Sequence, residues 1–116
     1  MTEQEKAIIR QMATYIELGS QGKQQITGRY SDDNNGCCAL GAMAIGAGFE
    51  PSDQNALFRI FDYIIPKAIY PSKIKTPWLP ESGEVRVDDV IFQLNDYAGW
   101  RFSQIVDWLK TIANGV

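Results

Sequence analysis

Residues 37–48, CCALGAMAIGAG, constrain the fold of this chain more than any other stretch, because every side chain in them is small or apolar. Cysteine, alanine and the aliphatic residues are among the most frequently buried residue types. The stretch therefore predicts a buried helix that starts near Gly36, and Gly46 and Gly48 weaken that helix toward its end. Its small residues would let a neighbouring backbone approach closely: Gly41, Ala42, Ala44 and Ala47.

The stretch SDDNNG, residues 31–36, precedes this helix. Asp and Asn side chains bond nearby amide groups in turns, and we expect Gly36 to adopt a positive φ there. Ser31, Asp33 and Asn35 match the first three ligand positions of a calcium loop, but Ala42 stands where the bidentate Glu is expected. A metal or small-ligand site in this loop is therefore the weakest of the functional hypotheses, and we expect neither a metal nor a cofactor.

The adjacent thiols of Cys37 and Cys38 allow two interpretations. A disulfide between them is disfavoured, because neighbouring Cα atoms lie about 3.8 Å apart and disulfides usually need roughly 4.4–6.8 Å. A helix start near Gly36 would lower the pKa of one thiol, which Asn95 or Asp96 could then assist in a thiol-dependent enzyme. The alternative, which we favour, is that both thiols are buried parts of a closely packed helix.

The chain contains no histidine. Histidine is the usual base that activates a serine or cysteine nucleophile, and a frequent ligand of transition metals. Ser-His and Cys-His catalysis within one chain are therefore excluded. A zinc site could use only the two cysteines and carboxylates.

Helical periodicity marks four further segments. Thr2 and Glu5 form a capping box before the first segment, and Gly19 ends it. The second follows Pro51 and is ended by Pro66; the third is capped by Asp88 or Asp89, and the last by Ser103. Their apolar stripes are Ile8, Ile9, Met12, Tyr15 and Ile16; Leu57, Phe58, Phe61, Ile64 and Ile65; Val90, Ile91, Phe92 and Leu94; and Ile105, Val106, Trp108, Leu109 and Ile112.

The predicted fold is α+β and mostly α, with about five short helices around one core, in a single compact domain of residues 1–116. Residues 84–87, EVRV, alternate as a strand does, and they would pair with residues 72–75 or with the segment around Ile26. This pairing makes a minor two-stranded β element.

The segment 66–83 is a predicted proline-rich loop, since it holds four of the five prolines of the chain. Long ordered loops on small domains are often functional. Large apolar residues are interspersed among its lysines, which suggests a partner-binding surface: Ile69, Tyr70, Lys73, Lys75, Trp78 and Leu79. The alternative is that Trp78 and Leu79 fold back over the core.

Charge and hydropathy restrict the partners. The net charge of −3 argues against binding to a phosphate backbone, which requires clustered basic residues. No apolar run approaches the roughly 20 residues that span a bilayer, and the polar start MTEQEKAIIRQ is unlike a signal peptide. With two cysteines and no export signal we expect a cytoplasmic protein.

Two stretches, GKQQITGRYSDDNNGCCALGAMAIGAG and LNDYAGWRFSQIVDWLKTI, resemble a family of small bacterial and bacteriophage proteins of unassigned function. The matching positions are a Cys-Ala-Leu-Gly-Ala helix start at 38–42 and an Asn-Asp turn at 95–96, before a terminal helix. The resemblance implies a compact helix-rich fold and a phage or prophage origin, and it brings no reaction. The proline-rich segment departs from it.

The sequence thus favours a non-enzymatic cytoplasmic binding protein that acts on a bacterial host protein, for example by inhibiting a defence complex. An acidic protein can mimic nucleic acid at a basic surface, which is compatible with that role. The rival hypothesis is the thiol-dependent enzyme described above. Self-association into a homo-oligomer is compatible with either.

Overall fold

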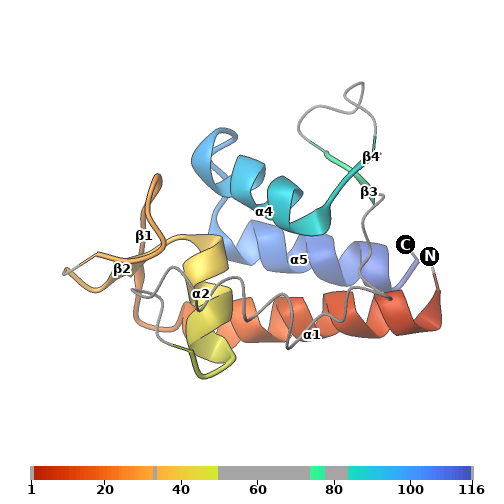
Figure 1. The fold of residues 1–116 in the computed structure, drawn as a ribbon, viewed down its shortest axis with the longest axis horizontal. Coiled ribbons are helices and arrows are strands. Elements are labelled where there is room, and N and C mark those ends of the chain that lie inside the picture. The colour runs from red at the N-terminus through yellow and green to blue at the C-terminus, as the bar shows by residue number, and fades with distance from the viewer. Residues whose placement is uncertain (1, 33, 50–73, 78–83, 116) are drawn as a thin grey trace.

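The computed structural model describes residues 2–32, 34–49, 74–77 and 84–115, and the fold below refers to these ranges. They form an α+β structure that is mostly helical (Figure 1). Two long helices, α1 and α5, lie side by side, α4 lies on the other side of α5, and α2 crosses one end of α1. The bounds are α1 Glu3–Gly19, α2 Ala39–Gly46, α4 Val87–Asp96 and α5 Phe102–Ala113.

The capping box predicted for the first helix is confirmed. The Glu5 amide donates to Thr2 Oγ1 at 3.1 Å, and the Thr2 amide donates to Glu5 Oε1 at 3.1 Å. Each bond satisfies an amide that the first helical turn leaves without a partner. Helix α1 ends at Gly19, as predicted, and its apolar stripe faces the core with Ile9, Met12 and Ile16 fully buried.

The close packing predicted for the small-residue stretch is also confirmed. A Cβ at Gly41 would collide with the Tyr30 carbonyl, and one at Gly46 would collide with the Tyr15 carbonyl. Gly19 of α1 makes the reciprocal approach, because a Cβ there would meet the Ala42 carbonyl. Helices α1 and α2 therefore touch backbone to backbone, which only glycine permits.

The predicted start of this helix near Gly36 is wrong. Strand β2 (Gly36–Cys37) occupies that position and pairs in parallel with β1 (Gln24–Gln25), so α2 begins only at Ala39 with Cys38 as its N-cap. The ladder takes the amide and carbonyl groups that a helix would otherwise use. The positive φ lies at Asn35 (64°) and not at Gly36, whose hydrogen in place of a Cβ leaves room for the Asp32 carboxylate and Ile26.

A second small sheet is formed by β3 (Ile74–Lys75) and β4 (Glu84–Val85). The two strands are antiparallel, with Ile74 opposite Val85 and Lys75 opposite Glu84. Of the two pairings predicted for residues 84–87, the one with residues 72–75 is confirmed. The Ile26 segment pairs instead with β2, so the described residues contain two β elements rather than one.

Two predicted caps are wrong. Helix α4 begins at Val87 with Arg86 as its N-cap, so Asp88 and Asp89 lie inside the first turn. Helix α5 begins at Phe102, with Arg101 as its N-cap, and Ser103 is the second helical residue. Extended backbone at the two arginines starts each helix earlier than the nearest small polar residue indicates.

One core joins the helices, built from α1, α2, α4 and α5 with Ile74 of β3. Four helices lie in the described residues; the predicted helix after Pro51 falls outside them, as does most of the predicted loop 66–83. No helix in the described ranges is long and apolar enough to cross a membrane.

Candidate functional site: a buried amide junction and an open pocket

The two stretches that carry the family resemblance meet at Asn95, the last residue but one of α4. Its side chain is only 2% exposed. Asn95 Oδ1 accepts hydrogen bonds from Gln25 Nε2 at 2.8 Å and from the Ala39 amide at 3.0 Å. Asn95 Nδ2 donates to the Ile26 carbonyl at 2.9 Å and to Asp96 Oδ1 at 2.7 Å. All four hydrogen-bonding positions of this amide are therefore used by the fold.

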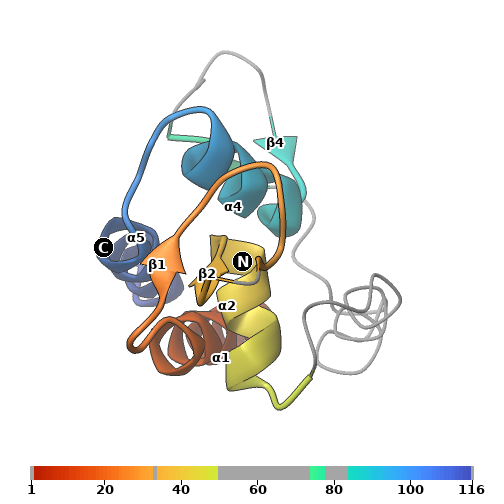
Figure 2. The same ribbon diagram turned by 90° about the vertical axis from the view of Figure 1, so that its left-hand side faces the viewer.

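Gln25 of β1 belongs to the same network. We use the term amide junction for the side chains of Gln25, Asn95 and Asp96 together with their hydrogen-bond partners. Besides Asn95, Gln25 Nε2 reaches the Trp100 carbonyl at 2.6 Å. Gln25 Oε1 accepts from the Phe102 amide at 2.8 Å, and so satisfies the first free amide of α5. One side chain thus holds β1, the end of α4 and the start of α5 together, at the end of the molecule that faces the viewer in Figure 2.

Asp96 is also committed to the structure. Its Oδ1 accepts from Asn95, and its Oδ2 accepts from the Gly28 amide at 2.8 Å, which fixes the turn after β1. The positive φ of 76° at Gly28 makes glycine necessary in this turn. Asn95 and Asp96, the residues suggested as assistants of a thiol nucleophile, therefore serve as structural ties.

Both thiols are buried, with Cys37 0% and Cys38 5% exposed. Burial raises the pKa of Cys37 to about 11, and the neighbouring Cys38 adds to the increase. Burial also raises the pKa of Cys38, although the Gly41 amide, which donates to Cys38 Sγ at 3.4 Å, opposes the change. Activation by a helix terminus requires a lowered pKa, and the shift at both thiols has the opposite direction.

The turn before β2 is held by its own acidic residue. Asp32 Oδ1 accepts from the amides of Asn34 at 2.9 Å and Gly36 at 2.7 Å, which confirms the predicted local bonding. Asp33, the central residue of the calcium-loop alignment, lies outside the described residues. Within the described ranges, no three Cys, Asp or Glu side chains are grouped closely enough to hold a metal ion.

The predicted partner-binding surface is described only at its edge. Its members Ile69, Tyr70, Lys73, Trp78 and Leu79 lie outside the described residues. Lys75 lies in β3, next to two residues that are buried, Ile74 and Thr76. The described part of the segment is therefore anchored in the core, and the surface itself stays a prediction.

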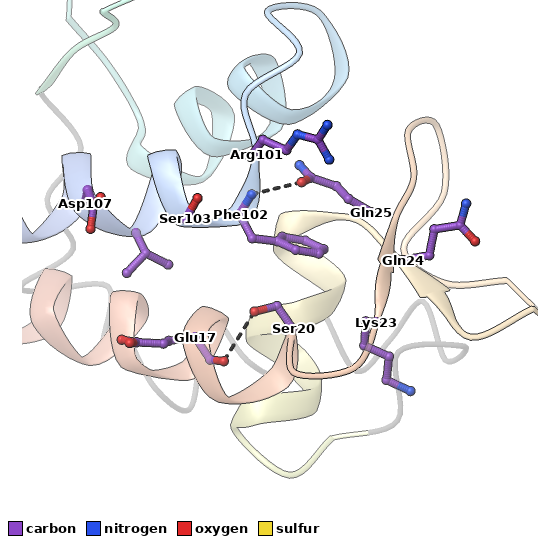
Figure 3. Close-up of a pocket in the computed structure, with 10 residues that line it drawn as sticks. Glu17, Ser20, Lys23, Gln24, Gln25, Arg101, Phe102, Ser103 and Asp107 are labelled. Carbon is purple, nitrogen blue, oxygen red and sulfur yellow. Dashed lines mark hydrogen bonds between the residues drawn. The ribbon is translucent and has the colours of Figure 1, made fainter.

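A pocket of about 590 Å³ lies beside the amide junction, between the end of α1, strand β1 and the start of α5 (Figure 3). The ring of Phe102 lies in it between Arg101 and Ser20. Its volume is within the usual range for ligand sites, roughly 300–1,000 Å³. Most of its lining residues are of polar or charged type: Glu17, Ser20, Lys23, Gln24, Gln25, Arg101, Phe102, Ser103, Val106 and Asp107.

The charged residues of the pocket differ in what they contact. Glu17 pairs with Lys110 at 3.0 Å, and Lys23 Nζ donates to the neutral Asn35 side chain at 2.7 Å. Arg101 and Asp107 form no ion pair within the described ranges. Among the residues that the structure describes, the positive charges of Lys23 and Arg101 thus have no ion-pair partner, and neither has the negative charge of Asp107.

Sequence reasoning missed this pocket. Its two walls, residues 17–25 and 101–107, are far apart in the chain, and each alone reads as an ordinary polar helix end or loop. Ser103 was expected to cap the last helix, so it had a structural explanation although it lines the pocket. No local pattern in either segment would have revealed it.

Comparison with known proteins assigns no family to the chain. No protein-family model matches it, and neither curated proteins nor solved structures show a significant match. The resemblance to small bacterial and bacteriophage proteins therefore stays a prediction.

Proposed function

We propose that this protein is a small non-enzymatic binding protein, of phage origin, that acts in the bacterial cytoplasm on a host protein. The observation that supports it best is the state of the polar groups around the thiols. The side chains of Asn95 and Asp96 form hydrogen bonds within the fold, and both cysteines are buried with raised pKa values.

The thiolate, not the thiol, is the nucleophile in cysteine chemistry. With a pKa of about 11, only about one Cys37 side chain in ten thousand is ionised at pH 7. A thiol-dependent enzyme would need the reverse arrangement, with an exposed and acidified cysteine. The described residues favour the binding function over that rival.

Inhibition of a host defence complex is the concrete form of the proposal. It draws on the family resemblance and on the net charge of −3, which suits a basic protein surface better than nucleic acid itself. In this form Trp78 is the leading contact residue, because tryptophan is enriched among interface residues whose truncation costs roughly 2 kcal/mol or more.

The test is capture of bacterial lysate proteins by the tagged chain, with mass spectrometry of what is retained. Trp78→Ala is measured beside Trp108→Ala, which alters a partly buried residue packed against the core. We expect Trp78→Ala to melt as the wild type does and to lose a specifically captured protein. Trp108→Ala should lower the melting temperature.

Two outcomes contradict the proposal. If Trp78→Ala melts as low as Trp108→Ala, Trp78 belongs to the core and the binding-loop idea fails. If the wild-type chain retains nothing beyond what a tag-only control retains, the binding function itself fails.

A further inference from the structure

We propose that the free edge of β1 binds an extended acidic peptide segment of a partner protein, which adds to the edge as a third strand. This inference rests on the proposed binding function and names the site and the chemistry of the partner. Three features support it: an unpaired strand edge, the rigid mounting of that strand, and the charges around it.

The unpaired edge follows from the register of the parallel ladder. The Gln24 amide donates to the Asn35 carbonyl and the Ile26 amide donates to the Cys37 carbonyl, each at 3.1 Å. Since alternate residues of a strand direct their backbone groups to opposite sides, the amide and carbonyl of Gln25 point away from β2. Neither group has a hydrogen-bond partner within the described ranges. Such an edge is a template for another strand.

The strand is held in place before any partner arrives. The Gln25 side chain is bonded to Asn95, Trp100 and Phe102, and Asn95 in turn holds the Ile26 carbonyl. A partner segment would therefore meet an edge whose conformation is already fixed. Such preorganisation reduces the entropy cost of binding.

The charges decide which peptide fits. Gln25 lines the same pocket as Lys23 and Arg101, which form no ion pair within the described part of the chain, whereas Glu17 is paired with Lys110. The lining itself holds two acidic and two basic residues, but the Glu17 charge is paired with Lys110 from outside the pocket. Among the lining charges that have no ion pair in the described residues, Lys23 and Arg101 therefore outnumber Asp107 by one, in a chain whose net charge is −3. Arginine binds carboxylates through a planar fork of donors. The carboxylate of a Glu or Asp in the incoming segment would bind the Arg101 guanidinium. An apolar side chain next to that residue would contact the Phe102 ring.

The probe is a phage-displayed library of random twelve-residue peptides, selected on the intact protein. We expect the enriched peptides to contain Asp or Glu and to lack proline at their centre. One such peptide, made synthetically, should bind Arg101→Glu at least about tenfold more weakly than the wild type. Asp107→Asn, which changes the charge of the same pocket in the opposite direction, should bind it at least as tightly as the wild type. The melting temperatures of both variants show whether each is folded.

A second measurement tests the strand itself. Bound peptide should slow the hydrogen exchange of the Gln25 amide, and methylation of the central amide nitrogens of the peptide should abolish binding. The inference is overturned if no peptide is enriched, if Arg101→Glu binds as tightly as the wild type, or if Gln25 exchange is unchanged. Each of these results leaves the lysate capture experiment untouched, so failure of the edge site is distinguishable from failure of the binding function.

Discussion

Asn95 and Arg101 are six residues apart, yet they belong to regions with opposite chemistry. Asn95 is 2% exposed and uses every donor and acceptor of its side chain within the fold. Arg101 is exposed in the pocket, and its guanidinium forms no ion pair in the described ranges. Polar groups that the fold has already satisfied specify structure, and those left without partners are available for recognition.

Gln25 connects the two regions. Its side chain forms the hydrogen bonds of the amide junction, and the same residue lines the pocket. Damage to the junction should therefore disturb the pocket, whereas changes in the pocket should leave the junction intact. This asymmetry can be measured.

The largest effect is expected for Asn95→Leu. Leucine of similar size would leave the Ala39 amide and the Ile26 carbonyl without their partner, and Gln25 Nε2 would keep only the Trp100 carbonyl. Each unsatisfied buried group costs about 1–3 kcal/mol, so we expect the free energy of unfolding to fall by about 3–5 kcal/mol. Urea denaturation measures it.

Asp107→Asn is the control on the pocket side, with an expected change within about 0.5 kcal/mol. If Asn95→Leu is as mild as this control, the junction is not what holds α2, α4 and α5 together. The contrast between the two regions would then be lost.

Gly41→Ala should have the next largest effect. Alanine favours a helix over glycine by about 1 kcal/mol, but its Cβ would collide with the Tyr30 carbonyl next to the junction. We expect the collision to prevail, with a net loss of about 1–3 kcal/mol in the free energy of unfolding. Gln4→Ala, at an exposed position of α1, is the control. A stabilised Gly41→Ala protein would show that α2 has room to move away.

The thiols lie in the segment that leads into α2, and their burial can be tested by pH. The pKa of Cys37 is about 11 in the folded protein, raised from 9.0, so folding favours the neutral thiol. This contribution to stability is fully present below pH 9 and is lost as the pH rises through 11. At neutral pH a native Cys37 also holds roughly a hundredfold less thiolate than an unfolded one.

Alkylation of Cys37 and Cys38 should therefore be much slower in the native protein than in urea. The rate at each residue can be followed by mass spectrometry. Fast native labelling of either cysteine near neutral pH would restore the thiol-enzyme hypothesis and would place a reactive group inside the region that we describe as structural.

The smallest effect is expected for Lys110→Met. The pair of Lys110 and Glu17 is solvent-exposed, and such pairs contribute at most about 1 kcal/mol. The variant leaves the Glu17 charge uncompensated in the pocket, so it should weaken binding of an acidic peptide while the melting temperature hardly changes. Lys6→Met, which removes a similar pair with Glu3, is the control and should leave binding unchanged. Equal binding by both variants would argue against the role of charge in the pocket.

Local patterns alone determined a large part of this fold. The capping box at Thr2 follows from residues near one another in the chain, and the small residues Gly41, Ala42 and Ala44 were enough to predict a close backbone approach, because capping and side-chain size act over a few positions. The buried face of α5 was predictable for the same reason: Ile105 and Leu109 recur at the helical period.

Only the tertiary structure decided what the central cysteine segment and the polar residues do. Cys37 lies in a strand because β1, from another part of the chain, takes its hydrogen bonds. In the sequence, Asn95 resembles any turn-forming residue. Its role depends on hydrogen bonds with Gln25 and Ala39, which lie far from it in the chain. The pocket exists because the end of α1 and the start of α5 are neighbours in space. These features depend on contacts between residues distant in sequence, and no local periodicity encodes such contacts.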